Sequence, residues 1–504
     1  MRVLYLSSEV VPFSKTGGLA DVAGALPEAL AQLGCEIRVL SPHYSGQKGG
    51  KQRTVSATTV PITVPINGRP QSLTLQTLAD GSSNVRHYFA EHAGYFSRAS
   101  LYVDPATGRD YPDNDERFVF LSRGALEWMR VDRWRPDIIH LNDWQTATTA
   151  AFLALLYRDD PALVQARTIL TVHNLAYQGL FDAERFEVLG LDPGLFFPTS
   201  PFEFWGKIGF LKTGLVYADK LNTVSPTYAR EIQSSPEFGC GLEGLLRERR
   251  ADLSGILNGI DDAVWNPATD SLIPQTFTPA APAGKKANKR YLLELCGFAK
   301  SRQDRPLIGM ISRLADQKGF DLVAEAAQRI FALDVNLVLL GTGDPAFHTL
   351  FEEWNKRFAT QFRAFLTFDN KLAHQIEAGS DMFLMPSRYE PCGLNQMYSL
   401  RYGTVPIVRA TGGLADTVFD ADDDAKRGNG FVFVDYTAEA MLAAVRRAVT
   451  AYGAPKRWAT LMKRGMETDF SWRRSAQDYI ALYEAALAAP PKERSSQPAV
   501  AVGR

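Results

Sequence analysis

Short apolar runs recur along the chain, and longer stretches with helical spacing separate them. Most runs are rich in Val, Ile and Leu and do not alternate with polar residues, which is typical of strands buried on both faces. The helical stretches between them indicate βαβ units and parallel sheets. We predict strands near 2–8, 36–41, 137–142, 168–173, 220–225 and 254–258 in the first half, and near 306–312, 335–341, 362–368, 381–386, 404–409 and 430–434 in the second.

A segment rich in Pro, Ala, Thr and Lys, from about Trp265 to Lys289, separates the two sets of strands. Its prolines disfavour regular structure, so we expect the crossing between two domains here, with a hinge near 258–275. A helical pattern follows the second set, and a low-complexity tail follows Pro490-Pro491. The predicted organisation is an α/β domain over 1–260, a crossing over 261–289, a second α/β domain over 290–465, a helix within 466–489 packing on the first domain, and a disordered tail over 490–504.

Composition narrows the possible classes of protein. The 504 residues carry 55 Lys plus Arg and 56 Asp plus Glu, so the formal net charge is -1. This balance argues against a partner bound mainly through charge, such as a nucleic acid. The four cysteines contain no CxxC pair, and no apolar stretch reaches the roughly 18 residues of a membrane span. We therefore expect a soluble cytoplasmic protein with no nucleic-acid or membrane partner.

Adjacent glycines follow the first predicted strand, in Lys15-Thr16-Gly17-Gly18. Glycines let a backbone approach a ligand, and the helix N-terminus after them presents N–H groups to an anion. The spacing matches neither common nucleotide motif. A tight turn with a solvated Lys15 explains the pattern about as well. A similar Gly412-Gly413 pair follows a strand in the second half.

Arg313 and Lys318 stand five residues apart on a turn that ends at Gly319. Both side chains could converge on one anion, and a diphosphate leaving group needs such a clamp. A solvated loop is the simpler alternative for an isolated pair of cations.

An acidic residue, Glu390, follows the apolar run 382–385 and precedes Pro391 and Gly393. An acid at the carboxyl end of a strand suits a fixed polar contact to a ligand. The alternative is a carboxylate that is favoured by the dipole at the start of a helix.

Polar residues also end two strands of the first half, in His140-Leu141-Asn142-Asp143-Trp144 and in His173-Asn174. His140 and Asp143 suggest a metal site, but no third ligand stands at a convincing spacing. A histidine at a strand end is often only a satisfied hydrogen-bonding residue. We therefore predict no metal and no cofactor.

Together these motifs resemble the bacterial glycogen synthases and the plant starch synthases, over roughly residues 1–485. Each motif alone is weak, but their combination in this order is highly specific. The motifs that carry the resemblance are Lys15-Thr16-Gly17-Gly18-Leu19, His140-Leu141-Asn142-Asp143-Trp144, Val172 to Gly179, Leu257-Asn258-Gly259-Ile260-Asp261, Arg313 with Lys318, Glu390-Pro391-Cys392-Gly393-Leu394, and Thr411-Gly412-Gly413-Leu414.

The resemblance implies the GT-B fold, in which two Rossmann-like doubly wound domains face one another across a cleft. It implies a retaining enzyme that transfers glucose from ADP-glucose to the 4-hydroxyl of glycogen or another α-1,4-glucan and releases ADP. No bound metal takes part in that transfer. The implied route is a front-face attack in which the leaving phosphate takes the proton of the acceptor.

The resemblance also implies roles for single residues. Catalytic roles fall on Glu390, Arg313, Lys318, His173 and Asp143. Binding of ADP-glucose falls on Lys15, Gly17, Gly18, Arg313, Lys318, Gly393 and Leu394, with Phe368 placed against the base. Binding of the acceptor falls on Glu9, Trp144 and Asn174. The position eight residues after Glu390 is Tyr398, where many related enzymes carry a second Glu, so a two-carboxylate mechanism is not expected.

Three other readings remain open. A GT-B enzyme using UDP-glucose differs from this prediction in its donor preference. A glucan phosphorylase would need a Lys that carries pyridoxal phosphate, and no residue pattern marks one. A non-catalytic carbohydrate-binding protein would not need the cationic clamp. Tyr102 and Trp205 are candidate contacts to glucan, although packing in a core explains them as readily.

Overall fold

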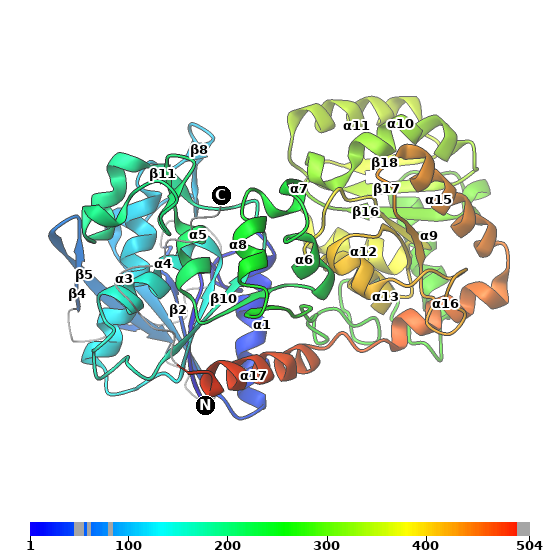
Figure 1. Ribbon diagram of the computed structural model, residues 1–504. Coiled ribbons are helices and arrows are strands. Elements are labelled where there is room, and N and C mark those ends of the chain that lie inside the picture. The colour runs from blue at the N-terminus through cyan, green and yellow to red at the C-terminus, as the bar shows by residue number, and fades with distance from the viewer. Residues whose placement is uncertain (45–54, 58–61, 79–83, 491–504) are drawn as a thin grey trace. The chain divides into compact units, whose positions relative to one another are not determined.

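The computed structural model describes residues 1–44, 55–57, 62–78 and 84–490. The chain divides into two compact units (Figure 1). Unit 1 comprises Met1–Val224, Ala229–Gly259 and Trp472 onward, and unit 2 comprises Ser225–Tyr228 and Ile260–Ser471.

The sheet of unit 1 runs in the order β15-β14-β10-β9-β1-β2-β6-β5-β3 within the described residues, and β4 pairs with β5. Neighbours from β15 to β6 are parallel, and β3, β4 and β5 add antiparallel pairs at one edge. The chain order therefore reverses between β1 and β9. The strands are β1 Arg2–Leu6, β2 Glu36–Pro42, β3 Val55–Ala57, β4 Ile62–Ile66, β5 Arg69–Leu78, β6 Val85–Glu91, β9 Ile138–Asn142, β10 Arg167–Val172, β14 Lys220–Thr223 and β15 Leu253–Gly255.

The helices of unit 1 cover this sheet. Helix α17 packs along α1, and α4 packs against both α3 and α5. The helices are α1 Gly18–Gln32, α2 Ala93–Phe96, α3 Asn114–Val131, α4 Asp143–Leu155, α5 Phe210–Tyr217, α7 Pro236–Gly239, α8 Glu243–Glu248 and α17 Trp472–Ala488, while α6 Pro226–Glu231 spans the division between the units. Short strands lie outside the main sheet: β7 Val103–Asp104, β8 Arg109–Asp110, β11 Leu180–Asp182, β12 Glu203–Phe204 and β13 Lys207–Gly209.

The sheet of unit 2 is entirely parallel within the described residues, in the order β18-β17-β16-β19-β20-β21. Numbered along the chain, this is the order 3-2-1-4-5-6 of the Rossmann fold, with its reversal between β16 and β19. Its strands are β16 Leu307–Ile311, β17 Asn336–Leu340, β18 Phe362–Phe365, β19 Met382–Met385, β20 Val405–Arg409 and β21 Phe431–Phe433. Its helices are α9 Ala283–Leu295, α10 Phe320–Phe331, α11 Pro345–Arg357, α12 Asn370–Gly379, α13 Asn395–Arg401, α14 Gly412–Thr417, α15 Ala438–Tyr452 and α16 Pro455–Glu467.

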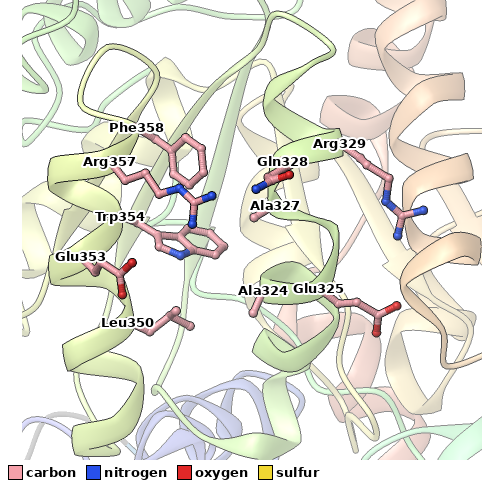
Figure 2. Close-up of a pocket in the computed structure, with 10 residues that line it drawn as sticks. All are labelled: Ala324, Glu325, Ala327, Gln328, Arg329, Leu350, Glu353, Trp354, Arg357 and Phe358. Atoms are coloured by element: carbon pink, nitrogen blue, oxygen red, sulfur yellow. The ribbon is translucent and has the colours of Figure 1, made fainter.

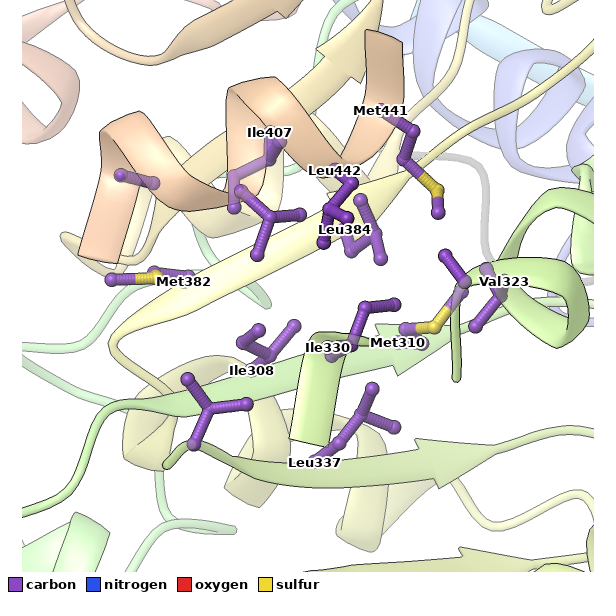
Figure 3. Close-up of a cluster of buried hydrophobic side chains, with 14 of the residues drawn as sticks. Ile308, Met310, Val323, Ile330, Leu337, Met382, Leu384, Ile407, Met441 and Leu442 are labelled. Atoms are coloured by element: carbon purple, nitrogen blue, oxygen red, sulfur yellow. The ribbon is translucent and has the colours of Figure 1, made fainter. Parts of the chain in front are cut away.

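The core of unit 2 shows why its strands are read so clearly from the sequence. Ile308 and Met310 of β16 pack with Leu384 of β19 and with Ile330 of α10, and all four side chains are at most 3% exposed (Figure 3). Strands buried on both faces need apolar residues at consecutive positions. The apolar runs of both halves are therefore confirmed as strands.

The predicted crossing over 261–289 needs correction. The segment lies wholly within unit 2, and its last residues form the first turns of α9. The prolines precede this helix, and Pro282 is its N-cap. The helix is rich in Ala, Lys and Leu, which favour helices, and its Lys285 and Lys289 are buried and hydrogen-bonded. Apart from the short stretch Ser225–Tyr228, the divisions fall instead after Gly259 and after Ser471. The predicted tail from 491 lies outside the described residues.

The sequence patterns also missed the antiparallel edge of unit 1. In β4 the side chains of Ile62, Val64 and Ile66 are buried while Thr63 is exposed. This alternation with period two is the signal of a strand with one buried face, and it was available in the sequence.

Candidate active site

Ligands of doubly wound folds bind outside the carboxyl ends of the strands, where the strand order reverses. In unit 1 these ends belong to β1 and β9, and in unit 2 to β16 and β19. The predicted loops around Glu9, Asp143, Arg313 and Glu390 follow these four strands in that order. The topology therefore gives each unit its own set of candidate residues at its own reversal point.

Glu9 anchors the loop that follows β1. Its carboxylate accepts hydrogen bonds from the backbone N–H of Thr16 and, at 3.0 Å, from the Thr16 hydroxyl. Burial raises the pKa of Glu9 to about 7, although the hydrogen bonds from Thr16 oppose this rise. Glu9 was expected to contact the acceptor, and in the structure its side chain, 3% exposed, positions the Lys15–Gly18 loop.

The Lys15–Gly18 loop leads directly into α1. The Lys15 ammonium donates to Asp21 at 2.6 Å, and about half of its side chain is exposed. A Cβ atom placed on Gly17 would meet no heavy atom within 4 Å. Packing thus does not require glycine at position 17, and open space adjoins the backbone at the N-terminus of a helix, which suits an anion.

Asp143 begins α4 in the left-handed backbone region, with φ 53°. Asp is one of the few residues that tolerate this conformation. Its carboxylate accepts from the backbone N–H of His173 at 2.7 Å and also from that of Asn174. Burial raises the pKa of Asp143 to about 7, and the nearby Glu9 adds to the rise. A single carboxyl thereby holds the ends of β9 and β10 together.

The His173 ring is held by the same strand end. Its Nε2 lies 2.9 Å from Oδ1 of Asn142, which also accepts from the Tyr5 hydroxyl at 3.1 Å. Burial lowers the pKa of His173 to about 3, so the ring is neutral near pH 7 and Nε2 donates to the amide oxygen. A neutral imidazole suits a hydrogen-bonding role toward a sugar hydroxyl better than a role as a cation.

Two neighbouring residues serve the core. His140 is fully buried between the Tyr483 hydroxyl at 2.6 Å and the Thr171 hydroxyl at 2.8 Å, which explains its position without a ligand. Trp144, predicted to contact the acceptor, is only 8% exposed, and a Cβ on Gly179 would lie 2.4 Å from its ring. Its indole therefore offers little surface to a ligand. Asn174 accepts from the N–H of Ala176 at 3.1 Å.

In unit 2 the central contact is an ion pair. Nζ of Lys318 lies 2.7 and 3.0 Å from the two carboxylate oxygens of Glu390, and the Ser387 hydroxyl donates to Glu390 at 2.9 Å. The side chains of the pair are mostly buried. Lys318 was expected to contact diphosphate alone, and the structure adds that it orients Glu390. Sequence reasoning missed Ser387, although a hydroxyl three residues before the acid was a usable signal.

Close backbone packing fixes this loop in place. A Cβ on Gly412 would lie 1.9 Å from the carbonyl oxygen of Glu390, and one on Gly413 would lie 2.0 Å from that of Cys392. A Cβ on Gly319, which has φ 73°, would lie 2.0 Å from the carbonyl oxygen of Pro386. The glycines therefore allow three segments to meet around Glu390.

The remaining predicted residues of unit 2 stand on loops around this pair. Arg313 is exposed on the turn after β16. Gly393 has φ 68°, and Leu394 is the N-cap of α13. Phe368, between β18 and α12, is 81% exposed, which leaves its ring open to a flat partner such as a base.

A surface cavity of about 460 Å³ lies elsewhere in unit 2, between α10 and α11 (Figure 2). It is lined by Arg329, Arg357, Trp354 and their neighbours, and by none of the predicted site residues. Trp354 is 4% exposed and offers no open ring face to a sugar. Of the two candidate glucan contacts, Trp205 is 83% exposed, whereas the Tyr102 hydroxyl is bonded to Ser8 at 2.7 Å.

Two kinds of feature are absent from the described residues. Within residues 1–44, 55–57, 62–78 and 84–490, no group of three or more His, Cys, Asp or Glu side chains is arranged to hold a metal ion. In the same part of the chain, no helix has the length and apolar character needed to cross a membrane.

Comparison with known proteins gives a consistent result over both units. Residues 2–248 match the model of the starch synthase catalytic domain, and residues 298–463 match that of the glycosyl transferases group 1. The glycogen synthase of Anaeromyxobacter dehalogenans strain 2CP-C is 50% identical over 96% of this chain and 99% of its own. The glycogen synthase of Syntrophotalea carbinolica is 46% identical over 97% of this chain and 99% of its own.

A solved structure agrees with these relatives. The catalytic domain of starch synthase IV from Arabidopsis thaliana, bound to ADP and acarbose, is 34% identical with a TM-score of 0.87, over 97% of this chain and 99% of that one. The fold is thus α/β with two parallel Rossmann-like sheets, of the GT-B type. With identities near one half over almost the whole length, the chain belongs to the glycogen synthase family of glucosyltransferases.

Proposed function

We propose that this enzyme transfers glucose from ADP-glucose to the 4-hydroxyl at the non-reducing end of an α-1,4-glucan, with retention and with release of ADP, in the cytoplasm. The observation that carries the proposal is the Lys318–Glu390 ion pair at the strand-order reversal of unit 2, with Arg313 on the adjoining loop. The starch synthase relative with ADP and acarbose bound supports both substrate classes.

The diphosphate and the base are assigned to unit 2. An ammonium has three N–H donors, and Lys318 directs two contacts at Glu390, so one donor is left for a phosphate oxygen. Arg313 adds a forked guanidinium that can bind two phosphate oxygens at once. Phe368 supplies an exposed ring for adenine, and the N–H groups of Gly393 and Leu394 supply further donors.

The glucosyl group and the acceptor are assigned mainly to residues of unit 1. The neutral His173 ring donates Nε2–H to Asn142, so its Nδ1 can accept from a sugar hydroxyl, and the Asp143 carboxylate can accept from another. Lys15 and the Gly17-Gly18 backbone offer positive potential at the start of α1 to the departing diphosphate. Glu390 is assigned to the hydroxyls of the donor glucose.

In the proposed step the bond between the anomeric carbon and the β-phosphate oxygen breaks, and its electron pair stays on the phosphate. The acceptor oxygen bonds to the anomeric carbon on the same face, and its proton moves to the leaving phosphate oxygen. The cations stabilise the charge that develops on that oxygen. Each preorganised donor of this kind contributes about 3–4 kcal/mol, or roughly 10²–10³ in rate.

The first test is incorporation of radiolabelled glucose into glycogen from ADP-glucose, with UDP-glucose in parallel. We expect ADP-glucose to be used far better. Equal use of both donors would overturn the assignment of ADP-glucose, and glycogen binding without release of ADP would overturn the assignment as a transferase.

The second test separates the clamp from surface charge in general. Arg313→Ala and Lys15→Ala should each reduce turnover by about 10²-fold with unchanged folding. Their matched controls are Arg329→Ala and Lys207→Ala, which remove exposed partners of Glu439 and Asp182. If the clamp variants turned over as fast as the controls, the proposed clamp would be wrong.

A further inference from the structure

Trp265 lies in the segment that joins Gly259 to α9, and its ring is held between two others. The His374 ring is stacked on one side at 3.8 Å between centroids and 9° between planes. The Tyr398 ring is stacked on the other side, with 3.9 Å between centroids and 11° between planes. All three residues belong to unit 2, so this three-ring arrangement, here called the Trp265 stack, lies within one compact unit.

A buried carboxyl fixes the stack from the same segment. Oδ2 of Asp270 accepts from the Tyr402 hydroxyl at 2.6 Å and is 2.8 Å from Nδ1 of His374. Its Oδ1 accepts from the backbone N–H of Leu272 at 2.8 Å. Asp270 and His374 are 6% and 1% exposed. The His374 ring therefore cannot leave its place in the stack without breaking a buried hydrogen bond that water does not replace.

The two outer rings belong to helices that begin at the two donor loops. His374 is on α12, whose N-cap Asp369 directly follows Phe368. Tyr398 is on α13, which directly follows the Glu390–Leu394 loop. In the sheet, β18 before α12 and β19 before α13 are separated by β17 and β16. Direct packing between the two helices, a hydrogen bond from Ser399 to Glu377 at 2.7 Å and the stack together set α12 against α13.

We propose that Trp265 is a positioning residue for the glucosyl transfer: it fixes the spacing between the loop that holds the base, at Phe368, and the loop that holds the glucose, at Glu390. The inference rests on the proposed function. It gives the segment before α9 a role in catalysis through Trp265, which contacts His374 on α12 and Tyr398 on α13. Reacting groups that are displaced by about 1 Å can lose about 10²-fold in rate, so small shifts between the loops are sufficient.

The main variant is Trp265→Leu, which removes the shared ring. We expect kcat/KM for ADP-glucose to fall by 30-fold or more, with KM for glycogen within about twofold of the wild type. Trp265→Phe keeps a flat ring between His374 and Tyr398 and should restore most of this loss. The control is Trp354→Leu, since Trp354 is a more deeply buried tryptophan of unit 2 that packs on Phe351 and Phe362, away from both loops.

A second variant removes only one of the two ring contacts of Trp265. It also replaces the main variant if Trp265→Leu does not fold. Tyr398→Leu leaves Trp265 against His374 but removes the ring contact between Trp265 and α13, so kcat should fall about tenfold while ADP affinity, measured by calorimetry, stays within twofold. Trp265→Leu should weaken ADP binding as well. In addition, Phe368→Ala should cost less ADP affinity in the Trp265→Leu background than in the wild type, because the base loop is already displaced there.

The outcomes distinguish the two proposals. If the wild type fails to transfer from ADP-glucose, the proposed function is wrong whatever the stack does. If the wild type transfers but Trp265→Leu loses no more activity than Trp354→Leu at equal folded fraction, positioning by Trp265 is wrong. Additive effects of Phe368→Ala and Trp265→Leu on ADP affinity would also overturn it.

Discussion

The same five residues, Gly-Gly-Leu-Ala-Asp, occur once in each unit, at 17–21 and at 412–416, and they do different things. Each copy follows a strand and opens a helix. In unit 1 the first glycine adjoins open space, since a Cβ there meets nothing within 4 Å. In unit 2 both glycines adjoin the backbone of the Glu390 loop, at 1.9 and 2.0 Å for a Cβ. In unit 1 the absent side chain leaves space beside the backbone for a ligand. In unit 2 the absent side chains let two backbone segments of the protein pack together.

The two aspartates differ in the same way. Asp21 pairs with Lys15, which is half exposed, so it holds a mobile cation near the predicted donor site. Asp416 accepts from the backbone N–H of Thr227 at 2.8 Å and from its hydroxyl at 2.7 Å, so it holds a backbone segment. An identical sequence therefore does not imply an identical role, because the role depends on what lies opposite the loop.

The largest effect is expected for Gly413→Ala. The added Cβ would overlap the carbonyl oxygen, carbonyl carbon and Cα of Cys392, and backbone cannot yield as a side-chain end can. We expect a loss of about 3 kcal/mol or more in the stability of unit 2 and a large loss of transfer as the Glu390 loop moves. Thermal unfolding measures the loss of stability, and initial rates measure the loss of glucosyl transfer. Unchanged melting of Gly413→Ala would refute the packing role of the second glycine pair.

The next effect concerns the acid that anchors the first glycine loop. The pKa of Glu9 rises from an ordinary value of 4.5 to about 7 in the folded protein, so the folded state binds this proton more tightly than the unfolded chain. The stability that the folded state gains from this protonation is complete below pH 4.5 and is lost as the pH rises through 7. The loss amounts to about 3 kcal/mol in the free energy of unfolding. Glu9→Gln should therefore flatten the pH dependence of thermal stability between pH 4.5 and 8. A variant with the wild-type slope would contradict this.

Gly17→Ala is the counterpart of the first variant and should change binding instead of stability. The methyl group enters open space, so the melting temperature should stay within about one degree of the wild type. The same methyl group stands where the donor approaches the backbone, so KM for ADP-glucose should rise about tenfold, or about 1.4 kcal/mol. Initial rates at varied ADP-glucose measure this. A loss of stability equal to that of Gly413→Ala would remove the distinction between the two copies.

The difference between these glycine loops marks the limit of prediction from the sequence. The apolar runs specified the strands, because burial on both faces leaves a pattern in neighbouring residues. They also located Glu9, Asp143, Arg313 and Glu390 at strand ends, where a doubly wound fold binds ligands. No local pattern specifies that Gly413 faces Cys392, or that Trp265 faces Tyr398 from more than a hundred residues away.

The same limit explains two differences between the predicted site and the observed one. A tryptophan after a strand is compatible with a ligand or with a core, and only the tertiary structure places Gly179 and Phe118 against Trp144. Lys318 and Glu390 were assigned separately because they lie 72 residues apart, and the parallel strands β16 and β19 bring them together. Contacts of this kind follow from topology, and topology was only implied by the βαβ pattern.

The smallest expected difference is between the two aspartates. Asp416→Ala removes two acceptors of a partly buried segment and should cost about 1 kcal/mol. Asp21→Ala breaks a pair whose lysine is half exposed, which is worth less than about 0.5 kcal/mol in water. Thermal unfolding of the two variants, each at low and high salt, measures the difference. Asp21→Ala should instead alter KM for ADP-glucose and its salt dependence, since it releases Lys15, whereas Asp416→Ala should not. If Asp21→Ala proved the more destabilising, the first copy of the sequence would also be a packing motif, and the case for Gly17 as the open side of the site would fail with it.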